Sequence, residues 1–248
     1  MVMRILLLVL ACTVVSRAGD FNDVVLRQVA SMPAGGGYAA TTRAHEALSA
    51  AVLFDADGLH IRATAAMPSY CSGATYLVFL KTLGELQRQG VIRLDRAGWS
   101  ALLPGKAADG QGVWGRWNAN GPGTPRLFHE LGLGRNFTEF TEAKPGDFLK
   151  IFWTDEVGKS ERGHSVIFLG LETKDGIERV RFWSSNKPDG YGEKSVPRQK
   201  IARAIFSRIE SPERIGAIAA LPERDSYLAG LLTRRSSFAE ALRMCGIR

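Results

Sequence analysis

Cysteine and histidine are both scarce in this sequence. Its 248 residues include three cysteines, Cys12, Cys71 and Cys245, and four histidines. So few cysteines exclude the disulfide framework that stabilises many small secreted domains. The cysteines and histidines are also too scattered to match the ligand spacing of a metal site. We therefore expect no metal site and no other cofactor.

Apolar runs long enough to span a bilayer are also lacking. The run from Ile5 to Val15 follows Arg4 and is bounded by Ser16-Arg17-Ala18, which resembles a small-x-small processing site. It is too short for a transmembrane helix. We interpret residues 1–18 as a cleaved signal peptide and expect an exported protein, periplasmic or secreted, without an integral membrane span.

Cys12 permits a second interpretation of the same segment. Val9-Leu10-Ala11-Cys12 resembles a bacterial lipobox, in which Cys12 would carry a lipid anchor. Leu10 fits that pattern poorly, and the apolar stretch before it is short. Cleavage after Ala18 is therefore the favoured interpretation.

Acidic residues are fewer than basic ones. The chain has 32 Lys and Arg against 25 Asp and Glu, a net charge of +7. Residues 1–18 contain Arg4 and Arg17 and no acid, so their removal takes away two positive charges and leaves a net charge of +5. This charge suits a polyanionic cell wall, or it serves solubility alone. No Lys/Arg run is interleaved with aromatic residues, so we expect no nucleic-acid binding.

Apolar periodicity predicts helices in the first half of the chain, at residues 20–31, 42–52, Cys71–Gln89 and 95–103. Asp57-Gly58 predicts a turn between two short extended segments that end at Met67-Pro68. Residues 104–125 are rich in Gly, Pro and Asn and predict a long surface loop. Thr124-Pro125 then starts a short helix that ends near Gly132 or Gly134.

After Pro145-Gly146 the pattern becomes extended. Asp147–Trp153, His164–Leu171 and Ile177–Trp183 predict an antiparallel meander, with a further strand at 202–209. Helix-start patterns at Ser211 and Ser237 predict two or three helices in the tail. Helices followed by antiparallel strands indicate an α+β fold. We therefore expect one domain at 19–210, with an insertion at about 90–143, and a helical extension at 211–248.

Cys71 is the first candidate catalytic residue. It lies at the start of a predicted helix, where unpaired N–H groups and the helix dipole lower the pKa of a thiol. The small residues Ser72-Gly73-Ala74 that follow let another backbone or a substrate come close. Taken alone, such a cysteine is more often a small buried hydrophobic residue.

His164 is the candidate general base. It begins a predicted strand, and a strand packed against the Cys71 helix would hold an imidazole rigidly toward the thiol. His45, His60 and His129 fit less well, because they lie in the middle of a helix, after a turn and in the short helix.

A third residue should orient the imidazole from the end of the next strand. Asn186 is the first choice, since its amide oxygen can accept a hydrogen bond from the ring without adding charge. Ser184 is the second choice. The alternative is that residues 186–190 are only a turn.

Two sequence blocks resemble the NlpC/P60 cysteine peptidases. Tyr70-Cys71-Ser72-Gly73 is similar to their Asp-Cys-Ser-Gly motif, with Tyr70 in place of the acid. Pro145-Gly146-Asp147, followed by the apolar segment 163–170 that begins Gly-His-Ser, resembles their second block. The related CHAP amidases end with a pattern similar to Ser184-x-Asn186. The resemblance covers roughly residues 65–90 and 143–186.

The resemblance implies a papain-like fold with a Cys-His-polar triad that hydrolyses amide bonds in peptidoglycan stem peptides. The expected partner is thus peptidoglycan or another peptide or amide substrate, bound by a monomer. Tyr70 and Ser72 beside the candidate nucleophile, and Trp114 and Trp117 in the predicted loop, are candidates for substrate binding. For the tryptophans, the favoured alternative is that they are partly buried packing residues. Two alternatives stay open: an acyltransferase or transglutaminase-like enzyme with the same site, and a non-catalytic module that binds the cell wall.

Overall fold

The computed structural model describes residues 20–56 and 58–248. The proposed signal peptide, Cys12 and Asp57 of the predicted turn lie outside these ranges. Within the two ranges, no helix combines the length and the apolar character needed to cross a membrane.

The helices predicted in the first half are present, with ends within two residues of those expected. They are α1 (Asn22–Ala30), α2 (Thr42–Ala51), α3 (Cys71–Arg88) and α4 (Arg96–Leu102). Thr41 and Asp95 cap α2 and α4 with their side-chain oxygens. The predicted extended segments form a hairpin of β2 (Val52–Asp55) and β3 (Gly58–Ile61), followed by the 3₁₀ turn η1 (Ala63–Ala66).

The prediction of a surface loop at 104–125 is wrong. This segment contains α5 (Gly112–Trp117) and leads into α6 (Gly123–Leu131), which ends at Gly132 with a left-handed φ of 65°. The side chains of Trp114 and Trp117 are buried in the main core. The glycines and prolines do mark turns of the chain. The two tryptophans between them bury a large apolar area, and this burial packs the segment against the core.

The strands form one antiparallel sheet of seven strands within the described residues, in the order β1-β9-β8-β7-β5-β10-β4. Their bounds are β1 Gly35–Gly36, β4 Gly134–Phe137, β5 Phe148–Phe152, β7 Gly163–Lys174, β8 Ile177–Asn186, β9 Gly190–Pro197 and β10 Arg203–Ile209. The meander β5-β7-β8 and the later strand β10 confirm the prediction. The sequence did not indicate β1, β4 and β9. The fold is mixed α+β.

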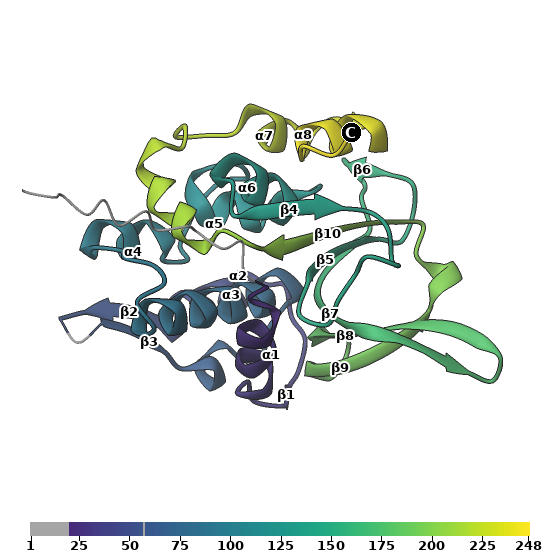
Figure 1. The fold of residues 1–248 in the computed structure, drawn as a ribbon, viewed down its shortest axis with the longest axis horizontal. Helices are drawn as coiled ribbons and strands as arrows, with labels where there is room; N and C mark the ends of the chain where they lie inside the picture. The colour runs from purple at the N-terminus through teal and green to yellow at the C-terminus, as the bar shows by residue number, and fades with distance from the viewer. Residues whose placement is uncertain (1–19, 57) are drawn as a thin grey trace, which may run out of the picture.

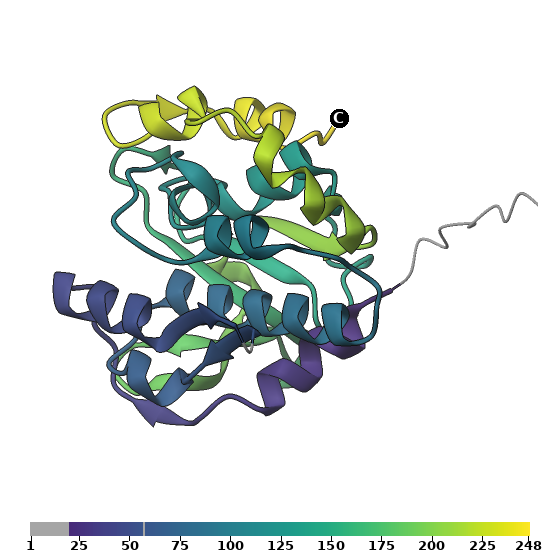
Figure 2. The same ribbon diagram turned by 90° about the vertical axis from the view of Figure 1, so that its left-hand side faces the viewer.

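The end of the chain forms a separate layer of short elements. These are η3 (Pro212–Ala220), α7 (Ser226–Gly230), β11 (Arg235–Ser236) and α8 (Phe238–Met244). β11 pairs with β6 (Val157–Gly158), the short strand between β5 and β7. Figures 1 and 2 show α7 and α8 in yellow, at the end of the molecule opposite the purple and blue N-terminal elements, whereas η3 packs against α4 and α6.

Apolar side chains cover both faces of the central strands. Phe148 and Ile167 belong to the large cluster that includes the helices, whereas their neighbours Leu149 and Val166 belong to a second cluster on the other face. This alternation follows from the two-residue period of a strand. Helix α3 contacts β7 and β8, so its first residue is held beside the start of β7.

A buried ion pair joins three segments at the start of β5. The Asp147 carboxylate is fully buried and accepts hydrogen bonds from Nε and Nη2 of Arg208, at 2.8 and 2.6 Å. It also accepts from the amide nitrogen of Asn22, at 2.9 Å, and from the backbone N–H of Lys144, at 2.8 Å. The Asp of Pro145-Gly146-Asp147 therefore connects β5 with β10 and α1.

Replacing Asp147 with Asn should lower the free energy of unfolding by about 3–5 kcal/mol, because the buried Arg208 would lose its counter-charge. Urea unfolding measures this change. Asp155→Asn is the matched control, since Asp155 pairs with Arg203 in solvent. We expect less than about 1 kcal/mol there. Equal effects of the two substitutions would contradict the assignment.

Candidate active site

Cys71 is the first residue of α3. Tyr70, which precedes it, has an extended backbone, and its carbonyl accepts the first helical hydrogen bond from Ala74. Tyr70 provides no side-chain cap. The N–H groups of the first helical turn therefore remain available to stabilise negative charge at Cys71. The thiol is free and half-buried.

The surroundings of Cys71 favour its thiolate. Burial by itself raises the pKa of the thiol, but four interactions together outweigh this effect and lower the pKa to about 6. They are a hydrogen bond and a charge interaction with His164, a hydrogen bond from the backbone N–H of Ser165 and the positive charge of Lys150. Cys71 thus meets the requirement for a nucleophile that is ionised at neutral pH.

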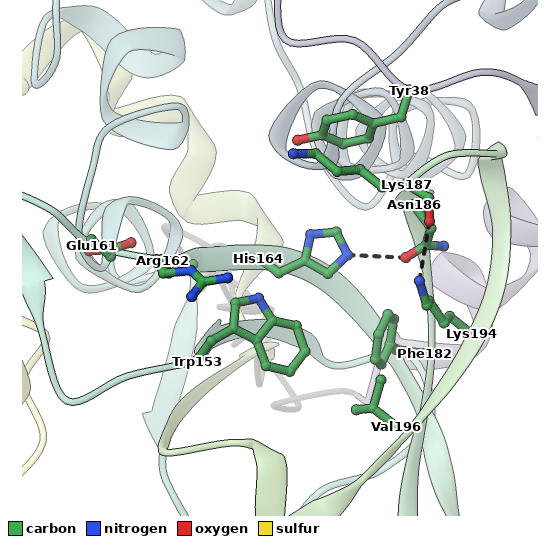
Figure 3. A pocket seen from close by; sticks show the side chains of 11 residues that line it. Tyr38, Trp153, Glu161, Arg162, His164, Phe182, Asn186, Lys187, Lys194 and Val196 are labelled. Atoms are coloured by element: carbon green, nitrogen blue, oxygen red, sulfur yellow. Dashed lines mark hydrogen bonds between the residues drawn. The ribbon is translucent and has the colours of Figure 1, made fainter.

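His164 is oriented by Asn186. Nε2 of His164 lies 3.1 Å from Oδ1 of Asn186, as Figure 3 shows. The amide nitrogen of Asn186 donates to the carbonyls of Gly192 and Ser184, at 2.8 and 3.3 Å. Because the amide nitrogen already has two acceptors, Oδ1 must face the imidazole. Nε2 therefore carries the proton, and Nδ1 is left as the basic nitrogen.

Ser184, the second choice for the third residue, has another partner. Its hydroxyl donates to the backbone carbonyl of Ser165 at 2.7 Å, and its side chain is completely buried. Ser184 therefore fixes β8 against β7, while Asn186 is the residue that contacts the imidazole. Asn186 is the last residue of β8, so the turn predicted at 186–190 begins immediately after it.

Tyr38 is a site residue that the sequence did not indicate. Its hydroxyl is hydrogen-bonded to Cys71, and burial, together with the negative charge of Cys71, raises the pKa of Tyr38 to about 12. Its backbone N–H donates to the carbonyl of Pro188 at 3.0 Å. This places the segment after β1 beside the nucleophile, although 33 positions separate residues 38 and 71.

A second buried ion pair lies against Gly163, the residue before His164. Nζ of Lys150 is 2.6 Å from Oε1 of Glu161, and both side chains are largely buried. The pair packs against Gly163, where an added Cβ would lie 2.5 Å from Oε1 of Glu161 and 2.7 Å from Nζ of Lys150. A larger residue at position 163 would have to displace these side-chain ends. The Gly of Gly163-His164 therefore lets this charge pair approach the strand that carries the base.

Three of the four residues expected to bind substrate are buried. The Tyr70 hydroxyl shares a hydrogen bond with Nδ1 of His45 at 2.8 Å, and the ring of Trp114 packs against the ring of Tyr70. Nε1 of Trp117 donates to the carbonyl of Ser72 at 3.1 Å. Because these side chains are at most 5% exposed, they support α3 and do not form a substrate surface. Ser72 is half-buried and donates to Oδ1 of Asn118 at 2.6 Å.

A cavity of about 440 Å³ opens beside the imidazole. Tyr38, His164 and Asn186 line it, together with Trp153 and Phe182 (Figure 3). The base and its partner therefore face a space that can admit a substrate. In the described ranges, no group of three or more His, Cys, Asp or Glu residues is placed to bind a metal ion.

Alkylation of Cys71 by iodoacetamide should depend on pH with a midpoint near 6, because the thiolate is the reacting form and its pKa is about 6. An unperturbed thiol would give a midpoint near ~8.5. His164→Ala should raise the midpoint, because the hydrogen bond and the charge interaction with His164 that oppose the effect of burial would be lost. Mass spectrometry of the Cys71 peptide measures the rate.

Cys245 is an internal control in the same experiment. Burial raises its pKa to about 12, so it should stay unmodified over the range in which Cys71 reacts. A midpoint for Cys71 near that of free cysteine, or one unchanged by His164→Ala, would contradict the interaction between the thiol and the imidazole.

Comparison with known proteins found no matching family model, no matching curated protein and no matching solved structure. The chemistry of the site is therefore inferred from its geometry. A thiol, an imidazole and an amide from α3, β7 and β8 interact in sequence, and the imidazole and the amide line the cavity. This arrangement can form a covalent acyl intermediate on sulfur.

Proposed function

We propose that the protein is a cysteine hydrolase, a peptidase or amidase that uses Cys71, His164 and Asn186. One observation carries the proposal: the thiol interacts with the imidazole, and the opposite nitrogen of that ring is 3.1 Å from the Asn186 amide oxygen. A buried amide held by two backbone carbonyls is a suitable partner for a ring that gains and loses a proton.

The first half of the reaction acylates the enzyme. Nδ1 of His164 takes the proton of Cys71, and the thiolate attacks the carbonyl carbon of the amide. The N–H groups at the start of α3 stabilise the developing oxyanion, with the Tyr38 hydroxyl as a further donor beside the sulfur. His164 then protonates the leaving nitrogen, the C–N bond breaks and a thioester remains.

The second half releases the acyl group. His164 removes a proton from water, which attacks the thioester carbonyl. The C–S bond breaks, and the thiolate leaves as the carboxylic acid forms. Throughout both halves Asn186 holds the ring in one orientation and accepts from its Nε2–H.

A papain-like fold of the NlpC/P60 or CHAP type is consistent with this assignment. The nucleophile begins a helix that packs on an antiparallel sheet, and the base and amide lie on adjacent strands of that sheet. With the two sequence blocks, this supports peptidoglycan stem peptides as the substrate. The apolar run within residues 1–18 supports export, and the net positive charge suits an anionic cell wall.

Cys71→Ala and His164→Ala should abolish hydrolysis of purified peptidoglycan, and Asn186→Ala should reduce it. Loss of the base alone removes about 10²–10⁴-fold in rate. The products are measured by mass spectrometry: hydrolysis adds one water at each cleaved amide, whereas acyl transfer joins the acyl group to an added amine. The second outcome would assign the transferase alternative.

His60→Ala is the matched control, because this histidine is exposed and contacts Asp55 away from the cavity. It should leave the rate unchanged. Full activity of Cys71→Ala or His164→Ala on every amide substrate tested would contradict the mechanism.

A further inference from the structure

The cavity beside His164 has an excess of positive charge. Arg162, Lys187 and Lys194 line it, and all three residues are exposed. Among the residues that the structure describes, none of the three has a carboxylate within 4 Å. The cavity contains one acid, Glu161, whose charge is matched by its buried pair with Lys150.

The three cations surround the imidazole. Figure 3 shows Arg162 to the left of His164, the side chain of Lys187 above it beside Tyr38, and Lys194 to the right beside Asn186. Nζ of Lys187 lies 5.3 Å from the centre of the Tyr38 ring, and the Tyr38 hydroxyl contacts Cys71. Lys187 therefore extends from the turn after Asn186 toward the nucleophile.

Lys194 lies beside the backbone of Lys187. It lies on β9, opposite Phe182 of β8, and its Nζ donates to the backbone carbonyl of Lys187 at 3.2 Å. This bond holds its ammonium group near the turn that carries Lys187. Two lysines from adjacent segments thus contribute positive charge to the wall of the cavity.

Aromatic and aliphatic side chains form the rest of the wall. The ring of Trp153 lies 6.3 Å from that of His164 and that of Phe182 lies 5.6 Å away, measured between centres. Val196 completes this apolar surface. The cavity therefore suits a group with an apolar body and an anionic end.

We propose that this cavity is a subsite for a carboxylate of the substrate, so that the enzyme prefers amide bonds in acidic peptides. The inference rests on the proposed function, because the cavity is lined by His164 and Asn186 of the proposed site and by Tyr38, whose hydroxyl contacts Cys71. Lys187 and Arg162 bind it as solvent-facing cations, with Lys194 adding to the local field. Such an interaction accelerates the encounter with anions and weakens as salt is added.

Two alkylating reagents of similar size test the subsite without a known substrate. Iodoacetate carries a carboxylate, and iodoacetamide carries a neutral amide in its place. In both reactions the thiolate of Cys71 displaces iodide as the C–S bond forms and the C–I bond breaks. The ratio of the two rates reports the preference for a negative charge at this site.

The ratio should fall on the order of tenfold in Lys187→Glu and in Arg162→Glu at low ionic strength. Added salt should lower the ratio of the unsubstituted protein toward the values of these variants. Lys174→Glu is the matched control, because this exposed residue at the end of β7 does not line the cavity and the substitution changes the net charge equally. Its ratio should stay close to that of the unsubstituted protein. After it accepts the Cys71 proton, His164 is positive and itself favours iodoacetate. The subsite is therefore judged from the change in the ratio between variants and not from the ratio of the unsubstituted protein.

The possible outcomes separate this subsite from the proposed function. Fast alkylation with one ratio in all variants would overturn the subsite and leave the cysteine hydrolase intact. An equal decrease in the rate ratio in Lys174→Glu and Lys187→Glu would show an effect of net charge only and would also overturn the subsite. Reaction with both reagents as slow as that of an unperturbed thiol would contradict the proposed function and the subsite together. Circular dichroism of each variant verifies its fold.

Discussion

The pairing of β7 with β8 is the constraint on which the candidate site depends. It brings His164 to Asn186, whose amide nitrogen is already satisfied by two backbone carbonyls. The amide oxygen therefore faces the ring, the proton lies on Nε2, and Nδ1 is the nitrogen available to Cys71. The choice of tautomer, and with it the role of the base, thus follows from backbone hydrogen bonds that lie behind the site.

A one-residue irregularity in this pairing is essential. At the turn, Lys174 pairs with Ile177, and this register holds as far as Gly170 and Arg181. A bulge between Phe168 and Gly170 then shifts the partner by one, so that Phe168 pairs with Phe182. Continued to the start of β7, the shifted register places His164 opposite Asn186, whereas the unshifted register would place it opposite Lys187. Local sequence indicated both strands and both residues, but not the bulge.

The features that could be predicted are those that depend on local sequence alone. Helix α3, its N-terminal cysteine and the strand that begins at His164 all follow from local periodicity and turn residues. The features that were missed join distant segments. Tyr38 reaches Cys71 through the pairing of β1 with β9, and the Lys150–Glu161 pair depends on β5 and β7 lying side by side. The burial of Trp114 and Trp117 likewise depends on tertiary packing that a Gly- and Pro-rich segment does not reveal.

The contact of Tyr38 with Cys71 has a consequence for folding. The site gathers side chains from residue 38 to residue 186, through the pairing of β1 with β9 and the packing of α3 on β7, which join segments far apart in the chain. Such non-local pairings form late, because a long loop must close before they add any stability. Until they form, Cys71 has neither the imidazole nor the strand N–H beside it and is an ordinary, weakly ionised thiol. Docking of α3 on the sheet therefore converts an inert side chain into a reactive one.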